Sequence, residues 1–375
     1  MLNLKVLFLT YAPSPYRVDF FNELGKLVDL TVCYEINKEE DKKKNGRNDL
    51  WHVKTNNNYK ETYLKYIRIY KYSISYDVIK IIKKKCFDII VIGGYNSLTA
   101  MITMEYLKKK KISFILSTDG GFPKTNENKI KYMVKRHFIS MADYYLSTGK
   151  NANNYLTYYG AKEDNIFIYP FTSMGEKDVL KLPLSKLEKQ KIKEKLKIDN
   201  KITFISVGRF MKIKGFDILI KSIKGLNNAQ FIIIGDKPNE EYLDLIKKLK
   251  ITNIKIIDFK QKKELMTYLK AADIFVLATR NDIWGLVINE ALSNGLPVIT
   301  TNKCGAGLDL VRDDYNGYLI EAENIKQLHD KMKIFIDEPK KIDEMGINAI
   351  ESIKNYTIEN EAKTHYEIFN KILNK

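Results

Sequence analysis

The sequence predicts an α/β protein with two doubly wound, Rossmann-like domains. The chain has 375 residues, which is enough for two domains at the usual size of roughly 150 residues each. Short apolar runs alternate with helical patterns, as they do in parallel sheets whose strands are joined by crossover helices. A charged segment interrupts this alternation once, and the alternation then begins again, which indicates a second sheet.

The first half of the chain contains six strand-like runs. They are short, rich in β-branched and aromatic residues, and bounded by turn-forming residues. Helical patterns separate them, for example over residues 15–27 and 98–110. We therefore expect an N-terminal Rossmann-like domain over residues 1–175. The runs are 5–10 (KVLFLT), 30–35 (LTVCYE), 88–93 (DIIVIG), 112–117 (ISFILS), 144–148 (YYLST) and 165–170 (NIFIYP).

The second half repeats the pattern after a Lys/Glu-rich stretch, residues 175–201, which predicts a connector with a surface helix. A C-terminal domain is expected over residues 176–355. Residues 356–375 predict a closing helix with no strand after it, and we expect this helix to pack back on the first domain. The strand-like runs are 202–207 (ITFISV), 230–235 (QFIIIG), 254–258 (IKIID), 273–278 (DIFVLA) and 297–301 (PVITT).

The composition excludes several classes of protein. Hydrophobic residues make up 45% of the chain, too many for a disordered protein. The longest apolar runs, such as residues 88–94, are too short to cross a bilayer, so a cytoplasmic location is expected. The three cysteines and four histidines are scattered, which argues against a disulfide framework and a structural zinc site.

The net charge of +17 has two interpretations. It reflects either a Lys-rich surface in water or attraction to an anionic partner, which is nucleic acid or the inner face of a membrane. No nucleic-acid-binding motif that would decide between these partners is visible, and the one segment that favours the membrane is residues 61–85. Residues 61–85 interleave Tyr, Ile and Lys, and they predict an amphipathic helix that either lies on an anionic membrane or packs in the core.

A cationic loop follows the strand-like run 202–207. Gly208 and Gly215 bracket the loop, and Arg209 and Lys214 lie inside it. Ligands of open parallel sheets bind beyond the carboxyl ends of the strands, where the next helix also presents unpaired N–H groups. Arg offers a planar fork to phosphate oxygens and Lys a mobile point charge. The loop is therefore either a phosphate or diphosphate site or an ordinary solvated connection.

A second motif favours the phosphate interpretation. Residues 276–301 lead from a strand through a polar loop into a helix that begins near Gly285. Asp282 and Glu290 flank this helix start, and Glu290 can accept two hydrogen bonds from the vicinal hydroxyls of a ribose. Gly285 allows backbone N–H groups to approach a ligand. Together with the cationic loop, the two carboxylates would hold the sugar and phosphate parts of one nucleotide.

These motifs resemble the second-domain signature of glycosyltransferase family 4, whose members are retaining nucleotide-sugar transferases of GT-B fold. The resemblance rests on VGRFMKIKG and NDIWGLVINEALSNGLPVI, supported by FIIIGDKP, LKAADIFVLAT and GAGLDLVRDDYNGYLI in the family's order, and it covers most of residues 201–321. It implies two domains that face a central cleft. It also implies transfer of a hexose or N-acetylhexosamine from a nucleoside-diphosphate sugar, with UDP favoured, to a saccharide acceptor in bacterial surface polysaccharide synthesis.

The resemblance also implies roles for single residues of the second domain. Arg209 and Lys214 would hold the donor diphosphate, and Glu290 would bind the ribose hydroxyls. Asp282 stands where the family usually has a Glu that reaches the donor sugar, and the shorter side chain changes that reach. The remaining candidates are the backbone groups of Trp284, Gly285 and Leu286 beside the diphosphate, Gly208 in the cationic loop, and Phe259 and Lys260 beside the base.

The first domain resembles the family less closely. The loop after its first strand, TYAPSPYRVDFF, lacks the family's Gly-Gly pair, but some surface-polysaccharide transferases have a similar Pro-Tyr-Arg segment. Arg17 in this loop either meets a phosphate or acceptor or is a surface residue at a helix start. Gly93 and Gly94 leave room for acceptor or donor after a strand, and Asp119 stands near the place of the family's donor-sugar His.

The expected chemistry needs no metal and no cofactor. No Asp-x-Asp metal-binding sequence is present, and cations with a helix terminus can stabilise the departing diphosphate. The positive charge fits a polyprenyl-diphosphate-linked acceptor at the inner face of the cell membrane, with the protein bound there peripherally. A nicotinamide oxidoreductase is disfavoured because the first strand is not followed by Gly-x-Gly-x-x-Gly. A non-catalytic nucleotide-sugar-binding subunit and a basic nucleic-acid-binding protein remain as alternatives.

Overall fold

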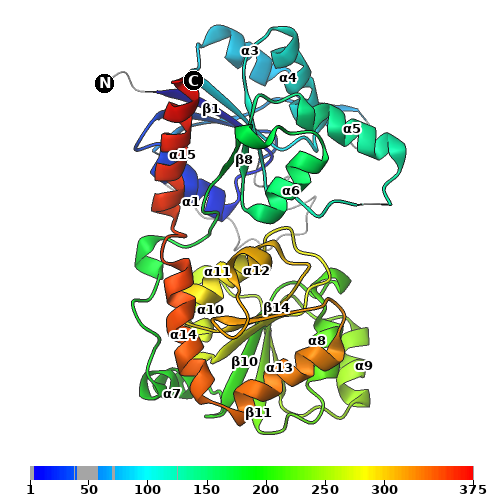
Figure 1. The fold of residues 1–375 in the computed structure, drawn as a ribbon, viewed down its shortest axis with the longest axis vertical. Helices are drawn as coiled ribbons and strands as arrows, with labels where there is room; N and C mark the ends of the chain where they lie inside the picture. The colour runs from blue at the N-terminus through cyan, green and yellow to red at the C-terminus, as the bar shows by residue number, and fades with distance from the viewer. Residues whose placement is uncertain (1–3, 38, 40–57, 70–71, 125, 375) are drawn as a thin grey trace. The chain divides into compact units, whose positions relative to one another are not determined.

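The computed structural model describes residues 4–37, 39, 58–69, 72–124 and 126–374. The chain forms two compact units. Unit 1 comprises Met1–Thr172 together with Ile358–Lys375, and unit 2 comprises Ser173–Thr357. The sequence pattern placed the boundaries slightly differently, after residues 175 and 355. Each unit is an α/β domain with its own sheet and its own buried apolar cluster (Figure 1).

Unit 1 contains a seven-stranded sheet in the order β3-β2-β1-β6-β7-β8-β9. Every neighbouring pair is parallel. The middle residues of the central strands β1 and β6 are apolar and buried, as expected where helices cover both faces of a parallel sheet. The six predicted strands are present, and β3 is an additional edge strand. The strands are β1 (Lys5–Thr10), β2 (Asp29–Tyr34), β3 (Lys60–Tyr63), β6 (Ile89–Gly93), β7 (Ile115–Thr118), β8 (Tyr144–Ser147) and β9 (Ile166–Ile168).

The final helix of the chain, α15, belongs to unit 1 and packs along α1 (Figure 1). Its inner face is aromatic: the rings of Phe20 and His365 lie 4.6 Å apart between centroids. The helix thus covers apolar residues of α1 and β1 although the whole of unit 2 separates it from them in sequence. The helices of unit 1 are α1 (Pro15–Leu24), α3 (Asp77–Lys84), α4 (Leu98–Lys109), α5 (Lys129–Ser140), α6 (Lys150–Tyr158) and α15 (Ile358–Leu373).

The single helix predicted over residues 61–85 is wrong. This stretch forms the end of β3, the antiparallel pair β4 (Ile67–Ile69) and β5 (Tyr72–Ile74), and then the short helix α3. Tyr70 and Lys71 lie outside the described residues. The physical reason is the β-branched and aromatic composition of the first part, which favours strands. Helical spacing of apolar residues holds only in α3, where Val78 and Ile82 are buried.

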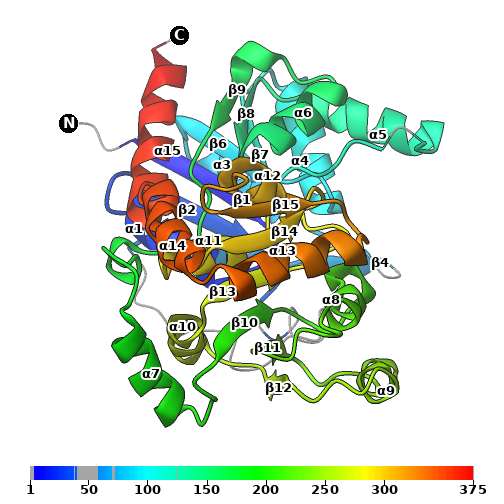
Figure 2. The same cartoon turned by 60° about the horizontal axis from the view of Figure 1, so that its bottom comes forward.

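Unit 2 contains a six-stranded parallel sheet in the order β12-β11-β10-β13-β14-β15, which can be followed in Figure 2. The five predicted strands are present, and β15 is additional. The order places β10 and β13 side by side in the middle of the sheet. The strands are β10 (Ile202–Val207), β11 (Ala229–Gly235), β12 (Ile254–Asp258), β13 (Ile274–Leu277), β14 (Val298–Thr301) and β15 (Gly317–Ile320).

The helices of unit 2 follow the strands as crossover connections and then close the unit after β15. The α-helices of unit 2 are α7 (Lys186–Lys195), α8 (Phe216–Ser222), α9 (Glu240–Lys248), α10 (Lys262–Ala271), α11 (Leu286–Ser293), α12 (Gly305–Leu310), α13 (Ile325–Asp337) and α14 (Lys340–Ile353). Single 3-10 turns occur at Glu163–Asn165, Glu176–Asp178 and Lys212–Lys214. None of the described helices is both long enough and apolar enough to span a bilayer.

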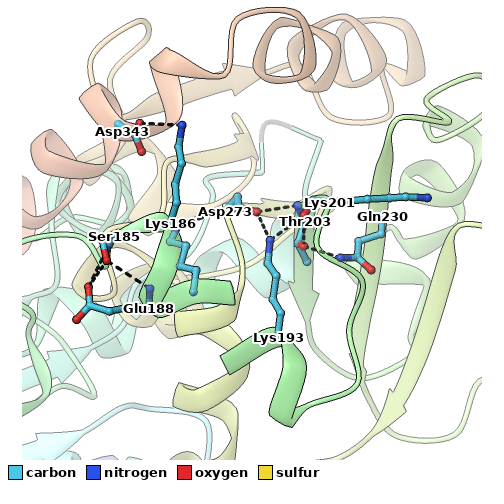
Figure 3. A network of polar contacts seen from close by, with 10 residues as sticks. Ser185, Lys186, Glu188, Lys193, Lys201, Thr203, Gln230, Asp273 and Asp343 are labelled. Atoms are coloured by element: carbon cyan, nitrogen blue, oxygen red, sulfur yellow. Dashed lines mark hydrogen bonds and ion pairs between the residues drawn. The ribbon is translucent and has the colours of Figure 1, made fainter. Parts of the chain in front are cut away.

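The connector helix α7 is held to the sheet of unit 2 by buried charges (Figure 3). Lys189 Nζ lies 3.1 Å from Asp273 Oδ1, and Lys193 Nζ lies 2.8 Å from Asp273 Oδ2. The backbone N–H of Thr203 also donates to this carboxylate, at 2.9 Å. Burial acts to raise the pKa of Asp273, but the two ammonium groups outweigh it and the pKa is lowered. The predicted surface helix therefore buries two of its lysines.

Candidate functional site

The cationic loop after β10, residues 208–215, packs closely against the end of β13. Gly215 has φ +69°, and a Cβ atom there would lie 1.8 Å from the carbonyl oxygen of Ala278. The carbonyl of Ile213 accepts hydrogen bonds from Arg280 N and from Thr279 Oγ1, both at 2.8 Å. Only glycine allows this approach, because any side chain would collide with the neighbouring backbone. The loops after the two central strands are therefore joined.

The loop after β13 is also fixed from its other side, by the residues that lead into α12. Asp282 N donates to Lys303 O at 2.8 Å, and Gly305 N donates to Asp282 O at 3.1 Å. Ala306 N donates to Trp284 O at 2.7 Å. These backbone bonds hold the main chain of Asp282 at the carboxyl edge of the sheet, where a parallel sheet binds its ligands.

The joined loops bring the candidate cation and carboxylate together. Lys214 Nζ lies 2.5 Å from Asp282 Oδ2, and the two side chains are 24% and 16% exposed. Arg209 directly follows Gly208 at the end of β10 and is exposed. A charge-assisted hydrogen bond in a partly buried position is stronger than a surface ion pair. Lys214 is therefore held by Asp282, whereas Arg209 and Lys212 of the same loop are exposed.

The start of α11 presents backbone N–H groups at the same edge. Gly285 has φ +95°, and a Cβ atom there would lie 2.7 Å from Cys304 Sγ, so this turn also requires glycine. Helix α11 begins at Leu286, and the first N–H groups of a helix have no partner within it. The Trp284 ring is buried and donates through Nε1 to Asn289 Oδ1 at 2.9 Å. Any ligand contact of Trp284 therefore has to come from its backbone.

Glu290 lies in the second turn of α11 and has a partner from the start of unit 2. Ser173 Oγ donates to Glu290 Oε1 at 3.0 Å. Lys262 Nζ in turn donates to the carbonyl of Ser173 at 2.7 Å. Burial raises the pKa of Glu290, while the Ser173 hydrogen bond and the Lys262 charge act to lower it. These two partners favour the ionised carboxylate, which is the form that accepts hydrogen bonds with both oxygens.

Phe259 and Lys260 are less closely tied to this group. They follow β12, which is the edge strand of the sheet and is separated from β10 by β11. Both are partly buried, and Lys260 Nζ lies 3.7 Å from Glu264 Oε1. The described residues contain no group of three or more His, Cys, Asp or Glu side chains placed to hold a metal ion. Metal-independent catalysis stays a prediction.

In unit 1, the structure pairs two of the candidates. Arg17 lies in the first turn of α1, and its Nη2 donates to Asp119 Oδ1 at 2.9 Å. The guanidinium carbon also lies 5.3 Å from the ring centroid of Phe171. Burial acts against the charge of Arg17, but Tyr169 and Asp119 act in the opposite direction, and the pKa of Arg17 is raised. Arg17 is thus an anchored cation and not a freely solvated surface residue.

Gly93 and Gly94 differ in what they allow. Gly93 ends β6, and a Cβ atom there would lie 2.8 Å from the carbonyl oxygen of Leu9. Close packing against the neighbouring strand β1 explains this glycine without a ligand. Gly94 has φ +101° and open space around its Cα. Of these two residues, Gly94 is the one with room for a bound group.

Sequence reasoning missed two buried titratable residues on α15. Glu361 Oε2 accepts a hydrogen bond from Thr172 N at 3.4 Å, and burial raises the pKa of Glu361 to about 8 although Arg17 opposes this. His365 Nδ1 donates to the carbonyl of Glu361 at 2.8 Å, and burial lowers the pKa of His365 to about 3. A signal was available: both residues fall on the apolar stripe of the helix with Ile358, Ala362 and Phe369.

Comparison with known proteins finds a family match within unit 2. Residues 188–352 match the family described as "Glycosyl transferases group 1". The matched segment includes the cationic loop, Asp282 and Glu290. The capsular polysaccharide biosynthesis glycosyltransferase CapM of Staphylococcus aureus is 27% identical over 202 residues, which are 52% of each chain. This chain spans about half the length of the first curated relatives that it matches.

Solved structures match the whole fold. A glycosyltransferase from Rickettsia africae superimposes with a TM-score of 0.77 at 16% identity, over 100% of this chain and 99% of that one. HepE of Anabaena, solved with UDP and glucose, superimposes with a TM-score of 0.73 at 15% identity, over 98% of this chain and 99% of that one. The predicted fold is confirmed: two Rossmann-like units with parallel sheets, shared with GT-B glycosyltransferases.

Proposed function

We propose that this chain is a retaining glycosyltransferase that moves a hexose or N-acetylhexosamine from a nucleoside-diphosphate sugar to a hydroxyl of a saccharide acceptor. The glycosyl transferases group 1 match supports the transferase class. UDP is the favoured nucleotide because HepE, which has a similar fold, was solved with UDP. An acceptor in surface polysaccharide synthesis is favoured because CapM is named for capsular polysaccharide biosynthesis, and the net charge of +17 favours linkage of that acceptor to a polyprenyl diphosphate.

The observation that carries this proposal is the arrangement of the two joined loops in unit 2. Lys214, Asp282 and the start of α11 meet at the carboxyl ends of the neighbouring strands β10 and β13. Glu290 follows one turn further along α11. A diphosphate would bind to Arg209, Lys214 and the N–H groups near Gly285, and a ribose would bind to Glu290. The diphosphate and the ribose of one nucleotide would thus each have binding partners at this edge of the sheet.

The proposed mechanism uses these groups to stabilise the leaving diphosphate. Negative charge grows on the diphosphate as its bond to the anomeric carbon breaks. Fixed cations and backbone dipoles that already point at that position lower the barrier without reorganising. Arg209 and Lys214 would supply the cations in unit 2, and the Asp282 carboxylate, which lies beside Lys214, would accept a hydrogen bond from the donor sugar. The bond that forms is between the anomeric carbon and the acceptor oxygen, and the proton of the acceptor hydroxyl passes to the departing diphosphate.

Unit 1 is proposed to bind the acceptor. Arg17 is the candidate for a phosphate of a lipid-linked saccharide, and Asp119 holds its guanidinium in place. Gly94 leaves open space after β6, at the carboxyl edge of the same sheet. The edge of a parallel sheet beyond its carboxyl ends is the usual place for a ligand in such a domain. Asp119 is a candidate for the contact that a His makes in many family members.

A membrane surface is the proposed location of the acceptor. The segment 61–85 is not a single helix, but α5 offers a more suitable surface. Ile130, Met133 and Val134 on α5 are 70%, 66% and 41% exposed. Lys129, Lys131 and Arg136 lie among them and are exposed as well. Apolar side chains framed by cations are typical of helices that lie at the headgroup boundary of an anionic membrane.

The decisive experiment is a donor and acceptor assay with the purified chain. We expect UDP to be released from one member of a panel of UDP-sugars only when a polyprenyl-diphosphate-linked saccharide is added. Nuclear magnetic resonance of the product should show the anomeric configuration of the donor. Binding of a UDP-sugar without release would instead support a non-catalytic binding subunit. An inverted product, or failure to bind any nucleoside diphosphate, would contradict the proposal.

A further inference from the structure

Glu290 belongs to a small cluster of polar residues whose other members lie outside the motifs recognised in the sequence. Ser173 is 8% exposed, and its hydroxyl donates to Glu290 Oε1 at 3.0 Å. Lys262, at the start of α10, donates from Nζ to the carbonyl of Ser173 at 2.7 Å. The same Nζ lies 3.0 Å from Asp178 Oδ2, which also accepts a hydrogen bond from Gly175 N at 3.3 Å. The ammonium group of Lys262 therefore contacts both ends of the segment from Ser173 to Asp178.

This arrangement solves a problem that burial creates for a ribose-binding carboxylate. A neutral carboxylic acid uses one oxygen as an O–H donor, which leaves mainly the carbonyl oxygen to accept hydrogen bonds from the two hydroxyls. An ionised carboxylate has free lone pairs on both oxygens, and it can accept from two vicinal hydroxyls at once. Burial alone would favour the neutral acid and so weaken the recognition of a ribose. The ionised form of Glu290 therefore needs neighbouring groups that stabilise its negative charge.

We propose that Ser173 and Lys262 are positioning residues for nucleotide recognition, which hold Glu290 as an ionised acceptor for the two ribose hydroxyls of the donor. This inference rests on the proposed function of the site, because Glu290 has a ligand only if the chain binds a nucleotide. The selectivity that follows is for a ribonucleoside diphosphate over its 2′-deoxy counterpart.

The two residues act on Glu290 in different ways. Ser173 donates a hydrogen bond directly, which fixes the rotamer of the carboxylate and stabilises its charge. Lys262 acts through Ser173, because it holds the carbonyl of that residue, and through its positive charge. Both effects act to lower the pKa of Glu290, against the larger effect of burial. Of the described charged groups, Lys262 acts on Glu290, and Asp178 shares that ammonium.

The test uses the full-length chain and compares binding of UDP with binding of 2′-deoxy-UDP by calorimetry. The variants are Ser173→Ala, Ser173→Thr, which keeps the hydroxyl, and Lys262→Gln. Lys263→Gln is the matched control, because Lys263 is the next residue of α10 and is exposed. Unfolding temperatures without ligand check that each variant is folded.

We expect the wild-type chain to bind UDP more tightly than 2′-deoxy-UDP. Ser173→Ala should weaken UDP binding at least about tenfold, since a hydrogen bond to a charged group is lost, and should weaken 2′-deoxy-UDP binding much less. Ser173→Thr and Lys263→Gln should stay close to wild type. The loss of UDP affinity on acidification should move to higher pH in Ser173→Ala and Lys262→Gln, because the Glu290 carboxylate then takes up its proton at higher pH.

Three outcomes would overturn the inference, and they are distinguishable. Equal weakening of both nucleotides in a folded Ser173→Ala variant would assign Ser173 a structural role only. An unchanged pH dependence of UDP binding in both variants would remove the effect on the charge of Glu290. Failure of the wild-type chain to bind UDP at all would instead reject the UDP donor of the proposed function, and the ribose inference with it.

Discussion

Lys214 Nζ lies 2.5 Å from Asp282 Oδ2, across the two loops that follow the neighbouring strands β10 and β13. This ion pair means that a bound diphosphate would share Lys214 with a carboxylate instead of meeting a free cation. The anchoring has a benefit, because a lysine whose rotamer is already fixed loses less side-chain entropy when a ligand arrives. Asp282 therefore orients the Lys214 ammonium group, and in the proposed site it would also contact the donor sugar.

Replacement of the loop cations should affect chemistry more than folding. We expect Lys214→Ala and Arg209→Ala each to lower kcat by at least about a hundredfold, because each removes one stabilising contact to the departing diphosphate. Lys212→Ala is the matched control, since Lys212 is an exposed lysine of the same 3-10 turn. Steady-state kinetics with a UDP-sugar measures the effect. Turnover within about twofold of wild type for either variant would contradict the phosphate role.

The buried charge cluster under α7 should contribute strongly to the stability of unit 2. Asp273→Asn leaves Lys189 and Lys193 buried without their carboxylate partner, so we expect a loss of about 3 kcal/mol in the free energy of unfolding. Asp343→Asn is the control, because its pair with Lys186 is exposed and spans 3.9 Å (Figure 3). It should change stability by less than about 0.5 kcal/mol. Urea unfolding of the two variants decides between these expectations.

The same cluster predicts a pH dependence with a definite sign. The pKa of Asp273 is lowered in the folded chain, so its contribution is present above the ordinary carboxyl pKa and is lost as the pH falls through the lowered value. The difference in unfolding free energy between wild type and Asp273→Asn should therefore shrink in acid. A constant difference from neutral pH down to strongly acidic pH would contradict this account.

Two glycines with positive φ provide a matched test of the joined loops. Gly215→Ala would place a Cβ 1.8 Å from Ala278 O, so we expect the loops to separate, with a loss of at least about 3 kcal/mol in stability and loss of nucleotide binding. Gly225→Ala has φ +90° but open space around the new atom, and it should cost only about 1 kcal/mol. Equal stability losses in the two variants would mean that the close approach of the loops is unimportant.

Glu361 should make unit 1 less stable as the pH rises through neutrality. Its pKa is raised from 4.5 to about 8, so the folded chain binds more protons than the unfolded chain between these values, and stability falls with rising pH. Glu361→Gln removes this effect, and its stability relative to wild type should increase by up to about 1.4 kcal/mol per pH unit in that range. Glu367→Gln, on the exposed side of α15, is the control and should show no such trend.

His365 acts in the opposite direction over a lower range of pH. Its pKa is lowered from 6.5 to about 3, so the unfolded chain binds more protons there and stability rises with pH. In the wild-type chain this rise offsets the fall from Glu361 where the two ranges overlap. Denaturant unfolding of Glu361→Gln should therefore expose a rise in stability between about pH 4.5 and about pH 6.5. If the variant shows a flat profile there, His365 is not a buried neutral imidazole.

The α5 surface should mediate binding to anionic vesicles. The double variant Ile130→Ser/Met133→Ser removes the two most exposed apolar side chains of this helix, and we expect it to weaken binding to phosphatidylserine vesicles at least about tenfold. Wild-type binding should also weaken as salt is added. Leu182→Ser is the control, because Leu182 is 68% exposed in unit 2. Replacement of Lys80, Lys83, Lys84 and Lys85 by Gln should matter less than the α5 variant, since α3 presents no comparable apolar group.

Vesicle flotation measures all of these variants under one set of conditions. If wild-type protein ignores anionic vesicles at low salt, or if the α5 variant binds as well as wild type, then α5 is not a membrane surface. The proposed lipid-linked acceptor would then lose its structural support in unit 1, while the donor site in unit 2 would be untouched.

The sequence predicts the two sheets well because central parallel strands are buried on both faces and appear as continuous apolar runs. The predicted strand 202–207 coincides with β10 for this reason. The short strands β3, β4 and β15 were missed, since three or four residues give too little pattern to separate them from loops. The helix predicted over residues 61–85 failed where β propensity outweighed an apparent helical spacing.

The candidate site was predictable only where its members are close in sequence. Arg209 and Lys214 lie in one loop, and Asp282 and Glu290 flank one helix start. One short sequence motif therefore contains both members of each pair. Ser173 is 117 residues from Glu290, and Glu361 is 189 residues from Thr172. Such contacts depend on how the whole chain folds. The apolar stripe of α15 could have indicated that Glu361 is buried, but no local pattern identifies the partner of Glu361 or of Glu290. The roles of all these side chains in binding and catalysis stay predictions until the variants are measured.

Unit 1 is formed by two separate segments of the chain, and this limits the order in which the protein can fold during its synthesis. Helix α15 follows the whole of unit 2 in the chain but packs on α1, near Phe8 and Phe20. The unit that starts first is therefore finished last, after the second unit has been synthesised in full. In the interval the nascent chain presents an uncovered aromatic face, the kind of surface that chaperones bind and that drives aggregation. A chain released before Ile358 would keep that face exposed permanently.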